Sequence, residues 1–214
     1  MTIRLNVPYL EYDQMRMMAE NFLREQQAWG KIPVRIEKII DIQMEIDIIP
    51  LPDLLRRFDI DAFISGDLRS ISIDRFIYES RSNRRRFSLA HETAHAILHR
   101  RFLEPFSFNT IDQYQQFLAE LDERDVSRME SQAYCFAGLL LVPTPFLSSE
   151  FQAALRDAEA ASIPIMKWRD IASDYVYTHL GRKFEVSTQV ISLRVDYDNL
   201  WDVAQTERRR TRPN

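Results

Sequence analysis

The sequence predicts an α+β fold, in which a small mixed or antiparallel sheet packs on helices and a helical, helix-turn-helix-like subdomain follows. Four glycines and nine prolines in 214 residues leave few positions that break a helix. Apolar residues recur at helical spacing in several segments, but alternate with polar ones between residues 42 and 48. We therefore expect a main domain at 1–147, a helical subdomain at 148–204 and a disordered tail at 205–214.

The first part of the chain predicts one helix and three strands. The helix covers residues 10–29, with Gly30 placed where a C-terminal cap would lie. Period-two alternation predicts a strand at 42–48 with one face buried. Two further strands fit residues 62–65 and 71–77, with a turn between them.

Three helices are predicted in the middle of the chain, at 83–101, from Thr110 towards residue 121, and at 126–141. Thr110 and Gln113 resemble a capping box, and Pro143 forbids continuation of the third helix. The first of these helices carries the histidines, and the third carries Glu130.

The segment beyond residue 148 predicts a short alanine-rich helix, a break at Pro164 and a helix at 167–180. Gly181 is the expected cap of that helix, and Ser187 the expected start of a last one. This pattern also fits a helix-turn-helix DNA reader, which is the main alternative function.

Three of the four histidines stand at positions 91, 95 and 99 of one predicted helix. Residues four apart share a helix face, so His91 and His95 can bind one metal ion. Glu92 lies about a quarter turn away, which suits a general base that acts on water at the metal. His99 lies a further turn along the face, where a supporting role is expected.

A catalytic zinc needs a third protein ligand and an open position. Glu130 begins a stretch whose next face is small or apolar and could pack closely on the histidine helix. Spacing alone does not separate Glu130 from Glu120, Glu123 or Asp125.

Two segments together resemble the ImmA/IrrE family of metallopeptidases: RFSLAHETAHAILH at 86–99, and ESQAYCFAGLLLVP at 130–143. The resemblance implies a zincin-like core in which His91, His95 and Glu130 hold Zn²⁺ and Glu92 is the base. Mn or Fe also suits nitrogen and oxygen ligands. Tyr134 and the pair Thr93-Ala94 depart from the commoner residues of the family.

The resemblance further implies an endopeptidase that cleaves a helix-turn-helix transcriptional repressor, encoded nearby, and so relieves repression. We expect the substrate to lie extended along the strand at 71–77, taken as an edge strand. The candidates for stabilising the oxyanion are Tyr78, Tyr134 and His179, with none preferred.

The overall charge is −4 with a pI near 5.6, which argues against nucleic-acid binding steered by the whole field. One cysteine, Cys135, and no long apolar run predict a cytoplasmic protein without a membrane segment. A DNA-binding or repressor-sequestering regulator with a non-catalytic metal site remains the alternative. The sequence does not indicate the oligomeric state.

Overall fold

The structure is a computed structural model that describes residues 2–163, 165 and 169–211. The chain divides into two compact units: unit 1 comprises Met1–Trp29 and Arg35–Leu141, and unit 2 comprises Gly30–Val34 and Val142–Asn214. The change of unit at residues 141 and 142 comes a few residues before the boundary expected from the sequence. Among the described residues, no helix is long and apolar enough to cross a membrane.

Unit 1 contains a three-stranded mixed sheet with the order β1-β3-β2. Its strands are β1 (Asp47–Leu51), β2 (Ala62–Ile64) and β3 (Ser70–Asp74). β3 runs parallel to β1 and antiparallel to β2. The α+β class and the small mixed sheet are thus as predicted. β3 is central, however, so the expectation that residues 71–77 form an edge strand is wrong.

The third strand ends earlier than predicted because of Asp74. Its carboxylate accepts a hydrogen bond from the backbone N–H of Ile77 at 3.2 Å and one from that of Leu55 at 3.0 Å. Asp74 therefore caps α4 (Arg75–Ser80), and it also binds the first turn of α3 (Leu54–Phe58). The chain turns into a helix where alternation alone suggested more strand.

The strand predicted at 42–48 is displaced towards the C-terminus. The chain forms α2 (Ile36–Lys38) and a π-helical turn, η1 (Ile39–Gln43), and β1 begins only at Asp47. Ile42, assigned to the buried face, is 61% exposed, whereas its helical neighbours Ile39 and Ile40 are buried. The left-handed backbone of Glu45, with φ 55°, separates helix from strand.

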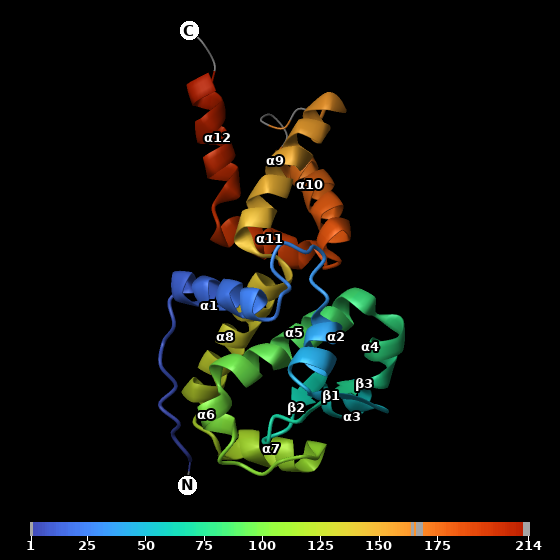
Figure 1. Cartoon of the computed structure of the whole chain (residues 1–214), viewed down its shortest axis with the longest axis vertical. Coiled ribbons are helices and arrows are strands. Elements are labelled where there is room, and N and C mark those ends of the chain that lie inside the picture. Colours follow the sequence, from blue (N-terminus) through green and yellow to red (C-terminus); the bar gives the residue numbers. More distant parts are fainter. Residues whose placement is uncertain (1, 164, 166–168, 212–214) are drawn as a thin grey trace. The chain divides into compact units, whose positions relative to one another are not determined.

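The described part of unit 1 has five further helices, of which α5 and α8 form a closely packed long pair (Figure 1). They are α1 (Tyr12–Glu25), α5 (Ser82–Leu98), α6 (Arg100–Leu103), α7 (Ile111–Glu120) and α8 (Glu123–Leu141). α7 begins with the predicted capping box of Thr110 and Gln113. Small, fully buried residues such as Ala94 and Ala133 allow α5 and α8 to pack closely. α1 packs on α8.

Unit 2 is helical: α9 (Thr144–Ala160) packs against α10 (Arg169–Phe184), followed by α11 (Thr188–Tyr197) and α12 (Leu200–Thr211). Ser187 caps α11 as predicted, but α11 is not the last helix. The expected disordered tail from residue 205 is helical as far as Thr211. Pro164, the expected break, lies outside the described residues.

Gly181 was expected to cap the helix before α11, but it lies inside α10. The turn instead uses Glu185 in the left-handed region, with φ 54°, and the N–H of Val186 donates to the Gly181 carbonyl at 2.9 Å. A Cβ at position 181 would lie 3.0 Å from the Val186 carbonyl oxygen. Glycine therefore allows a closer approach here than a residue with a Cβ.

Candidate metal centre

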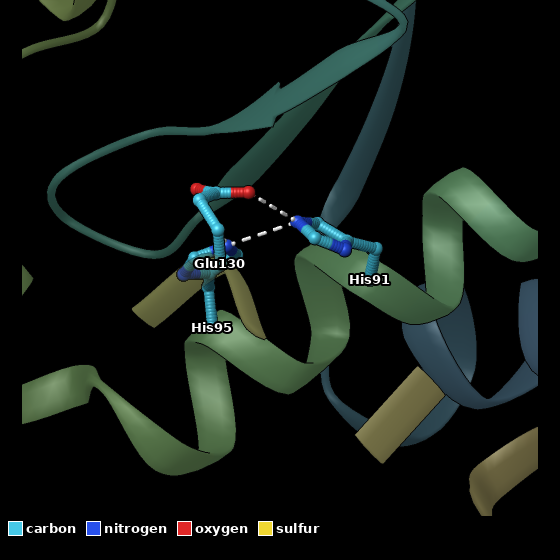
Figure 2. A group of neighbouring side chains, drawn as sticks. All are labelled: His91, His95 and Glu130. Atoms are coloured by element: carbon cyan, nitrogen blue, oxygen red, sulfur yellow. Dashed lines mark hydrogen bonds and ion pairs between the residues drawn. The ribbon is translucent and has the colours of Figure 1, made fainter. Parts of the chain in front are cut away.

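The histidine helix α5 presents two imidazole rings on one face. His91 and His95 are one turn apart, and their rings lie with centroids 4.9 Å from each other. His95 is buried, and the His91 side chain is 17% exposed. Figure 2 shows both rings rising from α5 towards the carboxylate of Glu130, which comes from α8. The packing of α5 on α8 thus brings together residues 35 positions apart.

The three side chains form a small triangle of two imidazole nitrogens and one carboxylate, in which the two histidines approach different oxygens of Glu130. His91 Nε2 lies 3.2 Å from His95 Nε2 and 3.1 Å from Glu130 Oε2. His95 Nε2 lies 3.5 Å from Glu130 Oε1. Ligand atoms bound tetrahedrally to zinc at 2.0–2.1 Å are about 3.3 Å from one another. The donor set and its spacing therefore fit a zinc ion with one position left open.

The charges of the triangle also suit a cation. Although burial favours a neutral ring, the hydrogen bond to Glu130 raises the pKa of His91. Burial likewise opposes ionisation of Glu130, but its bonds to the two histidines hold its pKa below the usual range. Glu130 is thus an anion at neutral pH, and its side chain is 45% exposed. An anionic carboxylate beside two imidazoles is a donor set typical of catalytic zinc.

Among the described residues, the acidic alternatives to Glu130 do not join this cluster. Glu120 ends α7, where it accepts a hydrogen bond from Gln116, and Glu123 is exposed at the start of α8. Asp125 is buried, and both its oxygens accept backbone N–H groups of the N-terminal segment. Of the four acids that spacing left open, Glu130 is the one that the structure places beside the two histidines.

Glu92 is buried beside the triangle, and its Oε2 accepts a hydrogen bond of 2.9 Å from the N–H of Ile64 in β2. Burial raises the pKa of Glu92, although the neighbouring histidines oppose that rise. A raised pKa suits a carboxylate that takes up and releases a proton near neutral pH. The strand edge therefore orients the expected general base.

The outer edge of β2 is covered on the side of the site. The Ile64 N–H is bound by Glu92, and the Gly66 N–H donates to the Phe108 carbonyl at 2.8 Å. A Cβ on Gly66 would lie 2.0 Å from the Phe106 carbonyl oxygen, so only glycine allows this approach. A substrate strand would find neither N–H free.

His99 lies behind His95 in a chain of hydrogen bonds. His99 Nδ1 is 3.1 Å from His95 Nδ1, and His99 Nε2 is 3.0 Å from Gln132 Oε1. Gln132 Nε2 in turn donates to the Pro8 carbonyl at 2.7 Å. Burial lowers the pKa of His99 to about 4. His99 contacts a predicted ligand without joining the triangle.

A cavity of about 20 Å³ adjoins the triangle and is bounded by Glu92, His95 and Glu130 on one side. Its other walls are mainly apolar: Ile64, Leu103, Phe108, Tyr114, Phe117, Leu118, Leu121, Val126 and Met129. This volume suffices for one water molecule. An apolar cavity with a few convergent charged groups is typical of a ligand site.

Tyr114 of α7 was not among the residues singled out in the sequence. Its ring stacks on Phe63 with centroids 5.0 Å apart, and among the described residues its hydroxyl has no hydrogen-bond partner. Burial, helped by the nearby carboxylates of Glu92 and Glu130, raises the pKa of Tyr114 well above its usual range. The hydroxyl is thus a donor at neutral pH.

The earlier oxyanion candidates are absent from the described lining of this cavity. Tyr134 is 42% exposed and packs its ring edge on Phe87. Tyr78 lies on α4 beside Arg85, and His179 lies on α10 of unit 2. The capping box before Tyr114 was visible in the sequence, but nothing there showed that its helix returns to the site.

Comparison with known proteins gives a family match. A peptidase family model, described as the IrrE N-terminal-like domain, matches residues 65–196. No curated protein matches the chain. A solved structure, a transcriptional regulator of Mycobacterium tuberculosis, is similar at 18% identity and a TM-score of 0.48. That similarity covers 85% of this chain and 46% of the regulator, so the chain spans about half of its length.

Proposed function

Because this chain belongs to the peptidase family described as the IrrE N-terminal-like domain, we propose that it is a zinc-dependent endopeptidase. Its ligands are His91, His95 and Glu130. The observation that carries this proposal is the close approach of the two imidazole nitrogens and the Glu130 carboxylate, with separations of 3.1–3.5 Å that are close to those between ligands of tetrahedral zinc. When bound there, zinc supplies a Lewis acid that polarises a carbonyl and lowers the pKa of water.

Glu92 acts as the general base in this proposal. Its carboxylate borders the cavity next to His95, and the Ile64 N–H holds one of its oxygens in place. It takes a proton from the attacking water and gives it to the amine that leaves, so the carboxylate is regenerated. Its raised pKa favours both transfers near neutral pH.

Tyr114 acts as the electrophilic partner. Its hydroxyl is protonated and unpaired among the described residues, and its ring is held by Phe63 and Phe108. A pre-oriented donor of this kind stabilises the negative charge that develops on the carbonyl oxygen. This role replaces the earlier candidates Tyr78, Tyr134 and His179.

The proposed substrate is a helix-turn-helix repressor encoded near this gene, as the ImmA/IrrE resemblance implies. Substrate cannot pair with β3 as an edge strand, because β3 is central. The apolar walls of the cavity favour an apolar side chain beside the cleaved bond. Since the cavity holds about 20 Å³, α7 or a neighbouring side chain must shift to admit one.

The test is cleavage of the neighbouring repressor by wild type and by Glu92→Gln. The variant should bind zinc as wild type does and lose cleavage by about 10²- to 10⁴-fold, the usual contribution of a general base. Glu123→Gln is the matched control, because Glu123 is exposed and lies outside the site. Full cleavage by Glu92→Gln would contradict the mechanism.

The same two proteins separate the alternatives. If Glu92→Gln relieves repression as well as wild type does, without cleaving the repressor, the chain acts by sequestering it. Salt-dependent binding of DNA by the purified chain, unaffected by Glu92→Gln, would indicate a DNA-binding regulator.

A further inference from the structure

The hydrogen-bond chain behind the site has a fixed direction, set at its outer end by Pro8. A carbonyl oxygen can only accept, so the Gln132 amide nitrogen must face Pro8 and its oxygen must face His99. That oxygen can also only accept, so His99 Nε2 carries a proton. The donor and acceptor roles of these three groups fix this proton on Nε2.

The inner end of the chain requires the same direction. A histidine that binds metal through Nε2 keeps its proton on Nδ1. His95 Nδ1 must then donate to His99 Nδ1, 3.1 Å away, which leaves the single N–H proton of the neutral His99 ring on Nε2. If the chain ran the other way, the proton of His95 would sit on Nε2, where the metal binds.

The outer anchor is an N-terminal segment, residues 2–8, that lies along α8. Asp125 accepts the N–H groups of Leu5, Asn6 and Val7 at 2.8, 3.1 and 2.9 Å. Arg128 donates to the Val7 carbonyl at 2.6 Å. Together with Gln132, these residues recur on one face of α8 at positions i, i+3 and i+7. The segment is therefore held in register with the helix that carries Glu130.

We propose that His99 and Gln132 are positioning residues that fix the tautomer and orientation of His95, with the N-terminal segment as their anchor. The inference rests on the metal site proposed above, but not on peptidase activity. Hydrogen-bond partners behind a histidine ligand typically alter metal affinity by 10- to 100-fold.

The primary experiment measures the zinc affinity of the full chain by chelator competition, and the absorption spectrum of the Co²⁺ form. Gln132→Met keeps the side-chain length and removes the acceptor, so zinc should bind 10- to 100-fold more weakly. Gln132→Glu keeps an acceptor for His99 but loses the donor to the Pro8 carbonyl, so it should weaken zinc binding less than Gln132→Met does. Ser131→Ala is the control, because its hydroxyl is exposed and bonds only to the Ser127 carbonyl of its own helix.

The outcomes discriminate positioning from packing. Equal weakening in Gln132→Met and Gln132→Glu, with equal loss of thermal stability of the metal-free chain, would mean that Gln132 only fills space and would overturn the proposal. Unchanged zinc affinity in Gln132→Met would overturn it too. If the Co²⁺ spectrum of His99→Leu indicates the loss of a nitrogen ligand, His99 itself binds the metal, contrary to the proposal.

A double-mutant cycle tests the anchor. Asp125→Asn should loosen the segment and weaken zinc binding by a few-fold, and it should have no further effect when combined with Gln132→Met. Additive effects would mean that the segment does not act through Gln132.

A failure of the proposed peptidase function can be distinguished from a failure of this inference. Wild type that binds zinc and shows the Gln132→Met effect, yet cleaves nothing, leaves this inference standing and removes the function. Wild type that binds no zinc overturns both.

Discussion

The two sides of the metal triangle differ in kind. On one side, here called the support side, His99, Gln132 and residues 2–8 form a continuous chain of hydrogen bonds. On the other, the cavity side, α7 and its neighbouring elements supply mostly aromatic and apolar walls around about 20 Å³ of space. The Tyr114 hydroxyl on that side has no partner among the described residues.

The difference separates two tasks within one site. Directional bonds with every donor matched to an acceptor fix ligands in a single arrangement. Apolar walls impose no direction, so they can adapt to a substrate side chain while excluding water. The support side should therefore control metal affinity, and the cavity side should control turnover.

The largest expected effect comes from removing Glu130, the acidic corner of the triangle between the support side and the cavity side. Glu130→Ala leaves two histidines without the anionic ligand, so zinc affinity should fall by more than the 100-fold typical of outer residues, and cleavage should be lost. Chelator competition and zinc content after gel filtration measure this loss. The neighbouring Ser131→Ala variant should bind zinc as wild type does. A Glu130→Ala chain that retains its full zinc content would mean that another residue is the third ligand.

A cavity-side change should affect turnover alone. Tyr114→Phe keeps the stack on Phe63 and removes only the hydroxyl, so kcat should fall by about 10²- to 10³-fold while zinc affinity stays constant. Tyr134→Phe makes the same chemical change at an exposed ring and should leave kcat intact. A rise in KM or a fall in zinc affinity without a change in kcat would assign Tyr114 to binding instead.

The candidate ligand residues could be named because their spacing is local or part of a known motif pair. His91 and His95 need only helical geometry, whereas Glu130 needed the family resemblance to be separated from Asp125, Glu120 and Glu123. The structure brings these three side chains together on α5 and α8. Their role as zinc ligands stays a proposal.

Other features depended on contacts between distant segments, which spacing does not encode. The strand predicted at 42–48 failed because Ile39 and Ile40 are buried by tertiary packing, which overrides the alternation of their neighbours. Gln132 binds Pro8, 124 positions away, and Gly66 admits the close approach of the segment before α7, the helix that carries Tyr114. Even so, the polar residues Asp125, Arg128 and Gln132 at i, i+3 and i+7 were a visible sign that α8 binds something on a second face.

The smallest expected effect concerns the anchor of the support side. Burial opposes ionisation of Asp125, but three backbone N–H groups outweigh it and hold its pKa below the usual value of an aspartate. A carboxyl group whose pKa is lower in the folded state than in the unfolded state stabilises the fold at any pH above its unfolded-state pKa. This stability is lost as the pH falls through the folded-state pKa. Asp125→Asn should therefore lower the free energy of unfolding of the zinc-free chain by about 2 kcal/mol at pH 7.

The pH dependence distinguishes this effect from a general loss of charge. The difference between wild type and Asp125→Asn, measured by urea unfolding, should be constant near neutral pH and shrink below about pH 4. Glu123→Gln removes the same charge from the first turn of α8 without breaking a bond to the segment, so its effect should be a few tenths of a kcal/mol. Equal destabilisation by both variants would mean that charge at the helix terminus, and not the bonds to residues 5–7, accounts for the stability.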